Sequence, residues 1–417
     1  MNRPRLHLPF LLVCLFISGV AFGQTAERVN LAPGGVEAAG GGSVVPALSA
    51  DGRYLVYVSA ATNLVAGDTN AAVDVFARDR QTGATTRVSL RSDGTQANGP
   101  SFSATISGNG RYVAFWSEAT NLVSDDSNDA VDVFVRDLQT SQTSRIDSGS
   151  SPSGHESNLT GFMYSLHTFL SVSDDGRFVA YSPALLPGRS GLPTTFEATI
   201  EVHDRSTGQE TTIGNGIRPS MSGDGRFVAY EGADFTGGGR RAYIAVYDRQ
   251  TAVTTRASVN NSGVAANGDC TWPAMAANGR FVAFECRATN LVPADTDPDQ
   301  DIFVRDLQLG QTSIASVTTS GTPMFGSGVA PAISADGRYV VFAAGRLVNV
   351  PQYLAMEIYV RDRQLGETKR LTQHLIFNAL HDSSFSPAIS ADGGWIAFAS
   401  SDADLVSGDT NGQDDVF

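Results

Sequence analysis

The sequence predicts an all-β fold in which seven four-stranded antiparallel sheets close into a ring. One short phrase, first seen as Ser49-Ala50-Asp51-Gly52-Arg53-Tyr54-Leu55-Val56-Tyr57, recurs through the 417-residue chain. Its Asp or Asn returns after steps of 58, 66, 49, 54, 58 and 56 residues, at Asp51, Asn109, Asp175, Asp224, Asn278, Asp336 and Asp392. A phrase that returns about every fifty residues is typical of a solenoid, a propeller or an array. Four strand signals in each repeat favour a seven-bladed β-propeller.

The first two strands of each repeat flank the Asp-Gly or Asn-Gly pair, which predicts a tight hairpin turn because such turns need positive φ angles. After the turn the residues are apolar at consecutive positions, as from Tyr54 to Val58, which is typical of a strand buried on both faces. Before the turn, a proline five residues ahead of the Asp or Asn favours an edge strand, since proline donates no hydrogen bond. These prolines are Pro46, Pro219, Pro273, Pro331 and Pro387. We therefore expect the first strands to line a central channel.

A third and a fourth strand follow in each repeat. The third runs from Asp74 to Asp79 in the first repeat and is echoed at 132–137, 301–306 and 357–362. Gln81-Thr82-Gly83 supplies a turn, and Thr85 to Ser89 forms the fourth strand. Four antiparallel strands, beginning with an edge strand, make a propeller blade.

The two ends of the chain predict how the ring closes. Ala26 to Leu31 copies the fourth-strand phrase but precedes any first strand, so this segment is expected to complete the last blade. The seventh repeat stops inside its third strand, at Asp415-Val416-Phe417. This stop favours a truncated chain over a closure that tolerates a short third strand.

Composition and the N-terminal residues predict an exported protein. The formal net charge is −14 and no basic cluster is present, which argues against nucleic-acid binding. Residues 1–23 have the pattern of a signal peptide, with Arg3 and Arg5, an apolar core and an Ala21-Phe22-Gly23 cleavage site. The core is too short to cross a bilayer. We expect residues 24–417 to form one monomeric propeller domain that is periplasmic or secreted.

Cys270 and Cys286 flank the Asn278-Gly279 turn almost symmetrically, so hairpin pairing would bring them face to face. In an oxidising compartment this favours a cross-strand disulfide within blade five. The alternative is two free buried thiols in neighbouring strands.

The phrase Ser334 to Phe342, followed by a strand that ends in Arg361-Asp362, resembles the repeats of TolB-like propeller proteins. The resemblance covers the whole mature chain. It implies a propeller fold and a role as a protein-interaction platform of the bacterial periplasm. TolB is six-bladed and has an extra N-terminal domain, whereas this chain shows seven repeats and lacks that domain. Similar propellers precede α/β-hydrolase domains in some peptidases, but this chain contains no Gly-x-Ser-x-Gly motif.

Acidic loops between the second and third strands are the most specific local signal. Four repeats carry closely spaced side-chain oxygens: Asp68, Asn70 and Asp74; Asp126, Asn128 and Asp132; Asp409, Asn411 and Asp415; and Asp295, Asp297, Asp299 and Asp301. Such oxygens suit calcium, although Asp and Asn also build loops without metal by bonding to their own backbone. Blade five, with four carboxylates, is the best candidate calcium site because their repulsion is otherwise hard to explain.

Arginines open the second strands and aspartates close the third strands in six repeats. In an antiparallel blade these two positions meet on one face, so we expect a structural Arg–Asp pair in each of these blades. The pairs would join Arg53, Arg111, Arg177, Arg226, Arg280 and Arg338 to Asp79, Asp137, Asp204, Asp248, Asp306 and Asp362, respectively.

The loops of the opposite face carry aromatic and histidine residues that predict a recognition surface. These are His155, Phe162, Tyr164 and His167 before blade three, Tyr353 in blade six, and His374, Phe377 and His381 before blade seven. The alternative is that these side chains only cover blade edges.

The main functional hypothesis is a non-catalytic exported propeller that binds a protein or peptide of the cell envelope. One alternative is a calcium-stiffened structural module of a larger surface protein. Another is an envelope polysaccharide hydrolase or lyase that uses carboxylates at the channel mouth, which would need two opposed carboxylates. No catalytic residue and no cofactor apart from calcium is predicted.

Overall fold

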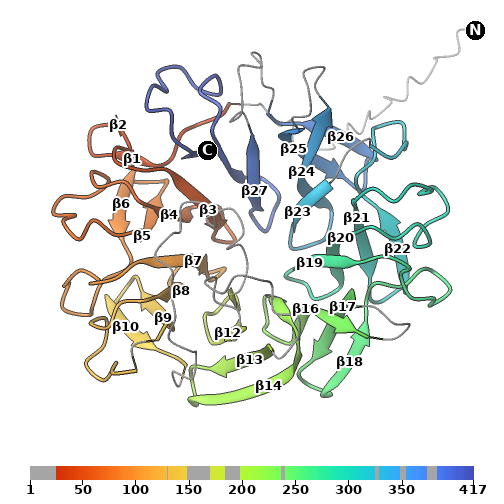
Figure 1. Ribbon diagram of the computed structural model, residues 1–417, viewed down its shortest axis with the longest axis horizontal. Coiled ribbons are helices and arrows are strands. Elements are labelled where there is room, and N and C mark those ends of the chain that lie inside the picture. The colour runs from red at the N-terminus through yellow and green to blue at the C-terminus, as the bar shows by residue number, and fades with distance from the viewer. Residues whose placement is uncertain are drawn as a thin grey trace, which may run out of the picture.

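The computed structural model describes residues 25–128, 130–147, 170–183, 198–235, 240–324, 328–347, 354–372 and 383–417. In these residues, seven sheets surround a central axis (Figure 1), which confirms the predicted seven-bladed propeller. Every regular element in the described ranges is a strand. The same ranges contain no helix with the length and apolar character needed to cross a membrane.

The first four blades follow the chain in order. Blade one contains β3 (Ser43–Leu48), β4 (Tyr54–Ser59), β5 (Asp74–Asp79) and β6 (Ala84–Arg87). Blade two contains β7 (Ser101–Ile106), β8 (Tyr112–Ser117), β9 (Asp132–Asp137) and β10 (Gln142–Arg145). Blade three contains β11 (Leu170–Val172), β12 (Phe178–Tyr181), β13 (Thr199–Asp204) and β14 (Gln209–Asn215). Blade four contains β15 (Ile217–Met221), β16 (Phe227–Asp234), β17 (Arg241–Asp248) and β18 (Val253–Arg256).

The remaining blades complete the ring. Blade five contains β19 (Cys270–Met275), β20 (Phe281–Cys286), β21 (Asp301–Asp306) and β22 (Gln311–Ile314). Blade six contains β23 (Gly328–Ile333), β24 (Tyr339–Leu347), β25 (Leu354–Asp362) and β26 (Glu367–Arg370). Blade seven contains β27 (Ser384–Ile389), β28 (Ile396–Ser400) and β29 (Asp415–Val416). A two-stranded hairpin, β1 (Leu31–Ala32) and β2 (Val36–Glu37), precedes blade one.

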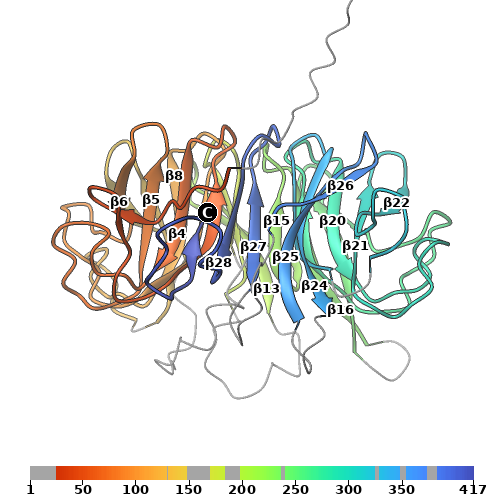
Figure 2. The ribbon, with the colours of Figure 1, turned by 90° about the horizontal axis from the view of Figure 1, so that it is seen from above.

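Within each blade the first strand lies nearest the axis, and consecutive strands pair antiparallel (Figure 1). Seen from the side, the strands run roughly along that axis (Figure 2). The ring therefore has two faces. The turn face carries the turns that join first to second and third to fourth strands. The loop face carries the loops that join second to third strands and one blade to the next.

The core lies between neighbouring blades, which explains why the second and third strands are apolar at consecutive positions. Val56 and Val58 of blade one, for example, belong to the same buried cluster as Val113 and Phe115 of blade two. Within blades, aromatic side chains of the second and third strands stack at centroid distances of 5.8–6.0 Å. Both faces of the second strands are thus removed from water.

The first strands share a β-bulge next to the channel. Register shifts occur at equivalent points in six blades, and each bulge holds one non-glycine residue at a φ between 50° and 58°. These residues are Val45, Ser103, Arg218, Trp272, Ala330 and Ser386. Five of them precede the prolines noted in the sequence. A bulge leaves a position out of the ladder, so the missing proline N–H costs no strand hydrogen bond.

On the turn face, seven main-chain hydrogen bonds run around the channel from blade to blade. The donor N–H and acceptor carbonyl residues are Ala50 and Gly108, Asn109 and Asp174, Asp174 and Gly223, Gly223 and Ala277, Asn278 and Ala335, Ala335 and Ala391, and Ala391 and Ala50. The distances are 2.8–3.1 Å. Because the last bond joins blade seven to blade one, this circle of bonds is closed.

The glycine of each repeated turn lies against an aromatic side chain of the preceding blade. A Cβ built on Gly176 would lie 2.0 Å from Cδ2 of Tyr112, and one on Gly52 would lie 2.3 Å from Trp395. Gly176 also has a φ of +74°, which a side chain rarely adopts. Glycine is therefore required both by the turn and by the close approach of the aromatic side chain from the preceding blade.

The N-terminal segment closes the ring, as the sequence predicted. The N–H of Val29 donates to the carbonyl of Val416 at 2.8 Å, matching the bond from Val88 to Val75 in blade one. The N–H of Val416 in turn donates to Oδ1 of Asn30 at 3.0 Å. Residues 25–30 form no regular strand, because β29 contains only two residues and offers a short ladder.

The hairpin of β1 and β2 continues this closure. It repeats the bridge between Leu90 and Gln96 that links blades one and two. The segment before blade one thus has two roles. Residues 25–30 form the outermost segment of blade seven, and β1 and β2 form the linker from blade seven to blade one.

Candidate functional site

All eight aromatic and histidine residues predicted for a recognition surface lie outside the described residues: His155, Phe162, Tyr164, His167, Tyr353, His374, Phe377 and His381. The predicted signal peptide, residues 1–23, also lies outside them.

The six predicted Arg–Asp pairs form on the turn face. In each pair, Nη2 of the arginine lies 2.7 Å from Oδ2 of the aspartate, and Nε donates to the same carboxylate. The carboxylates also accept main-chain N–H groups of the following turn, as Asp79 does from Gln81. Their role is structural, because each one fixes a turn to the second strand.

The acidic loops of blades one and two each receive an arginine from the fourth strand, and that of blade seven receives Arg28 from the N-terminal segment that takes the place of a fourth strand. Arg87 reaches Asp68 at 2.9 Å and Asp74 at 3.1 Å in blade one. Arg145 contacts Asp126 and Asp132 at 3.2 and 3.6 Å, and Arg28 contacts Asp409 and Asp415 at 3.2 and 3.1 Å. The asparagines Asn70, Asn128 and Asn411 donate to the third-strand aspartates Asp74, Asp132 and Asp415. A guanidinium thus occupies the place that we had predicted for a metal ion.

The acidic loop of blade two has an additional carboxyl group beside it. Asp147 stands where blade one has Ser89, and it is buried beside Asp132. Burial, followed by repulsion from Asp132, raises the pKa of the Asp147 carboxyl. Arg145 therefore shares its charge among three carboxyl groups.

Blade five has the acidic loop but no matching arginine. Ile314 occupies the register position of Arg87 and Arg145, since each of the three residues pairs with the phenylalanine of its third strand. Ligand-type oxygens of Asp295, Asp297 and Asp301 lie within 4.8 Å of one another. Asp299 lies outside this group and is exposed, and its N–H donates to Oδ1 of Asp297 at 3.0 Å.

Burial shifts the protonation of this blade-five cluster. Desolvation, with added repulsion from the neighbouring aspartates, raises the pKa of Asp295 to about 6 and that of Asp301 to about 7. Both side chains belong to residues only 2% exposed. No nearby positive charge offsets the mutual repulsion of these carboxylates among the described residues.

Cys270 and Cys286 form a disulfide between β19 and β20. At the same position, blades one, two and seven pair two buried serine hydroxyls at 2.8–2.9 Å: Ser43 with Ser59, Ser101 with Ser117, and Ser384 with Ser400. The covalent bond of blade five therefore replaces a hydrogen bond used elsewhere in the ring.

A cavity of about 300 Å³ lies along the channel axis. Its walls come from the first strands of all seven blades and consist mainly of small and apolar residues, such as Ala47, Pro331 and Ile389. Trp272 is the one large aromatic side chain among the residues that line this cavity. The described channel wall therefore offers apolar contact area and few reactive groups.

Four charged or aromatic residues of blades four and five gather where the channel opens towards the loop face. Arg218 lies 2.7 Å from the buried Glu231, and its guanidinium covers the ring of Trp272 at 4.4 Å. Glu285 accepts a hydrogen bond from Thr271 at 2.6 Å and one from the N–H of Ala330 at 3.2 Å. We call Arg218, Glu231, Trp272 and Glu285 the mouth cluster.

Burial dominates the electrostatics of the mouth cluster. Desolvation raises the pKa of Glu285 to about 7, although the hydrogen bonds from Thr271 and Ala330 oppose the shift. Desolvation also raises the pKa of Glu231, while Arg218 lowers it. A carboxyl group that keeps a proton near neutral pH can donate or accept one.

The sequence interpretation missed the mouth cluster. Glu231 and Glu285 stand at a position of the second strand where other repeats have Val58, Trp116 or Ala343. A comparison of the repeats position by position would have shown these two acidic residues in an otherwise uncharged column, which includes Ser182 in blade three.

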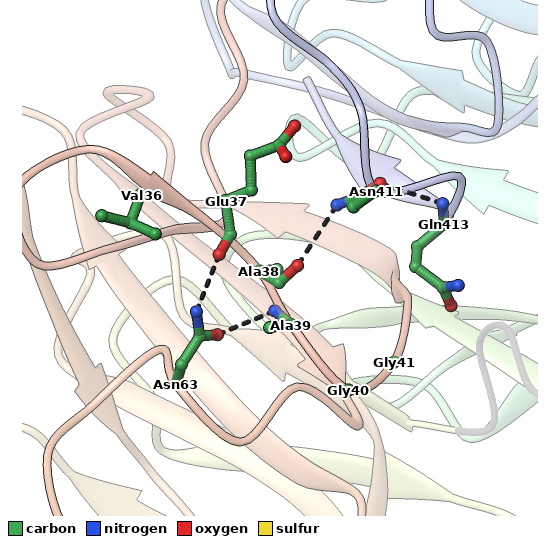
Figure 3. Close-up of a pocket in the computed structure, with 9 residues that line it drawn as sticks. All are labelled: Val36, Glu37, Ala38, Ala39, Gly40, Gly41, Asn63, Asn411 and Gln413. Atoms are coloured by element: carbon green, nitrogen blue, oxygen red, sulfur yellow. Dashed lines mark hydrogen bonds between the residues drawn. The ribbon is translucent and has the colours of Figure 1, made fainter.

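A second cavity, of about 580 Å³, lies at the seam where the ring closes (Figure 3). Asn63 binds the carbonyl of Glu37 and the N–H of Ala39, and Asn411 donates to the carbonyl of Ala38. Asn121 and Asn290 make the same pair of contacts at other blade junctions. The seam is thus a structural junction, and the cavity adds no separate reactive group.

No model of a protein family matches the chain, and no curated protein sequence matches it. Among solved structures, the chain is similar to oligogalacturonate lyase from Vibrio parahaemolyticus, with 13% identity, 94% of this chain and 89% of that chain covered, and a TM-score of 0.56. It is also similar to the β-propeller domain of the Trilobed protease from Pyrococcus furiosus, with 12% identity, 87% and 90% covered, and a TM-score of 0.53.

TolB from Acinetobacter baumannii is 16% identical, with 83% of this chain and 66% of that chain covered and a TM-score of 0.44. The likenesses to oligogalacturonate lyase and to the Trilobed protease domain, both at low identity, agree with the propeller fold of this chain.

Proposed function

We propose that this protein is an exported, non-catalytic propeller that binds a protein or peptide segment of the cell envelope at the mouth cluster. The observation that carries the proposal is the placement of Trp272, which lines the channel and lies under the guanidinium of Arg218. Trp and Arg are the residues that most often dominate binding energy at protein interfaces. The apolar channel wall behind them would take up an extended peptide side chain.

The fold supports this role because it holds the site rigidly. The circle of turn-face hydrogen bonds and the six Arg–Asp pairs fix the blades, so a ligand pays little ordering cost in the protein. The propeller fold itself is shared by binding proteins and by enzymes, and it does not select between them.

The test is selection of peptides from a random library displayed on phage, using the mature protein. We expect selected peptides to lose about tenfold or more in affinity to the Trp272→Ala and Arg218→Ala variants. Leu309→Ala is a matched control, because Leu309 is an exposed apolar residue on the turn face of the same blade. Equal binding to wild type and Trp272→Ala, or no selected peptide at all, would contradict the proposal.

One observation favours a second candidate, an enzyme that acts on envelope polysaccharide. The Glu285 carboxyl, with a pKa of about 7, has the property of a general acid or base at the channel mouth. Activity against a panel of acidic and neutral glycans, abolished in Glu285→Gln, would support this candidate. Glycan turnover that survives this substitution would argue against a role for Glu285.

A further inference from the structure

We propose that blade five binds one calcium ion through the carboxylates of Asp295, Asp297 and Asp301, in the loop between β20 and β21. In this view the ion takes the place that an arginine side chain holds in the corresponding loops of other blades. The inference is independent of the binding role proposed for the mouth cluster.

The first step is the equivalence of the loops. Asp68 and Asp74 of blade one correspond to Asp295 and Asp301 of blade five, because β4–β5 and β20–β21 have the same pairing register. Asp74 accepts a hydrogen bond from Ser89 at 2.5 Å, and Asp301 accepts one from Ser316 at 2.5 Å. The third-strand aspartate therefore has the same hydroxyl partner in both blades.

The second step is the source of positive charge. Fourth-strand arginines at one equivalent position contact a carboxylate in five blades: Arg28, Arg87, Arg145, Arg256 and Arg370. In blade five this position is Ile314, whose side chain cannot offset a charge. Among the described residues, no basic side chain forms an ion pair with Asp295, Asp297 or Asp301.

The third step is an unpartnered atom. Oδ1 of Asp295 is buried and has no hydrogen-bond partner, and its carboxylate contributes to the group of ligand-type oxygens that lie within 4.8 Å of one another. A buried carboxylate oxygen without a partner is costly, whereas coordination of a cation removes that cost. The three carboxylates thus share one centre that lacks a cation-like partner.

The donor set selects the kind of ion. Three carboxylates offer hard oxygen ligands and no nitrogen or sulfur, which suits calcium and disfavours zinc or copper. Calcium accepts six to eight oxygens in loose geometry, so backbone carbonyls and water can complete the shell. Extracellular calcium modules of this type bind with dissociation constants of about 10⁻⁴–10⁻³ M.

The experiment compares thermal unfolding of the mature protein in EDTA, in calcium chloride and in magnesium chloride at equal ionic strength. A ligand that binds only the folded state raises Tm, and calcium at tenfold its dissociation constant should raise Tm by about 1–2 °C in a chain of this size. Asp295→Asn should remove this response. The same Tm in EDTA and in calcium would overturn the proposal.

Two further variants make the test specific. Ile314→Arg supplies the missing guanidinium, so it should raise Tm in EDTA and abolish the response to calcium. Asp68→Asn in blade one is the matched control, and it should leave the calcium response unchanged. A response that persists in Ile314→Arg, disappears in Asp68→Asn or is equally large with magnesium would contradict the assignment.

Discussion

The turn face and the loop face are built from the same seven repeats, yet only the turn face repeats its contacts around the ring. Turn-face hydrogen bonds link every blade to the next, and each turn glycine lies against an aromatic ring. On the described part of the loop face, equivalent positions hold different chemistry, such as Val58 in blade one and Glu285 in blade five. This difference indicates that contacts on the turn face fix the arrangement of the blades, so residues on the loop face can vary without loss of the fold.

The largest expected effect tests the interlocking of the turn face. Gly176→Ala should lower the free energy of unfolding by about 4 kcal/mol, because the new methyl group overlaps Tyr112 and the backbone is held at a positive φ. Urea unfolding followed by tryptophan fluorescence would measure this loss.

Gly94→Ala is the control for backbone strain alone. Gly94 has a φ of +90° but no atom within 4 Å of the added Cβ, so we expect a loss of about 1 kcal/mol. Similar losses for the two variants would show that blade-to-blade contact at the turn glycine contributes nothing.

The next effect concerns the disulfide at the loop-face end of blade five. Replacing both cysteines by serine should lower stability by about 3 kcal/mol, since the bond closes a loop with a sequence separation of 16. The variant should still fold, because a serine pair occupies this position in blades one, two and seven. An unfolded double variant at 25 °C would show that the bond does more than replace a hydrogen bond.

The Glu285 carboxylate of the mouth cluster should lower the free energy of unfolding above neutral pH. The pKa of Glu285 rises from 4.5 to about 7 on folding, so its favourable contribution is complete below pH 4.5 and is lost as the pH rises through 7. Glu285→Gln should therefore be more stable than wild type by about 1 kcal/mol at pH 8, with little difference at pH 4.

Glu231→Gln is the matched comparison for Glu285→Gln. Glu231 is paired with Arg218 at 2.7 Å, so its neutralisation should destabilise the fold at pH 8. Chemical unfolding at the two pH values measures both variants. A loss of stability in Glu285→Gln at pH 8 would mean that its carboxylate is better solvated than the structure indicates.

The smallest effect is expected from a single Arg–Asp pair. The hydrogen bond from Arg53 lowers the pKa of Asp79 to about 2, so the contribution of this carboxylate is present above pH 3.8 and is lost as the pH falls through 2. Asp79→Asn should lower Tm slightly at pH 7, and its difference from wild type should narrow as the pH falls from 4 towards 2. A constant difference across that range would exclude the ion pair as its cause.

The sequence predicted those features that depend on contacts within one repeat. The Asp-Gly turn, the consecutive apolar residues from Tyr54 to Val58, and the pairing of Arg53 with Asp79 all follow from hairpin geometry. The N-terminal closure was also predictable, because residues 26–31 copy a fourth-strand phrase. These features are confirmed.

Contacts between blades and between distant strands could not be predicted in this way. The close approach of Tyr112 to Gly176, which leaves no room for a Cβ, depends on the angle between neighbouring blades. No single repeat encodes this angle. The arginine in the acidic loops lies in the same repeat as its aspartates, yet it was missed, because the contact from Arg87 to Asp68 joins the fourth strand to a loop 19 residues earlier in the chain. The mouth cluster joins two blades through the bulges at Arg218 and Trp272, so its two acidic residues can be recognised in the aligned repeats, whereas their contacts cannot.

The contact that closes the ring also has a consequence for biosynthesis. Val29 is among the earliest residues of the propeller to leave the ribosome, whereas its partner Val416 follows it by 387 positions and is among the last. The opening segment must therefore wait, unpaired and exposed to proteases and other chains, until blade seven has been synthesised. Any factor that shields residues 25–37 during this interval would improve the yield of intact protein.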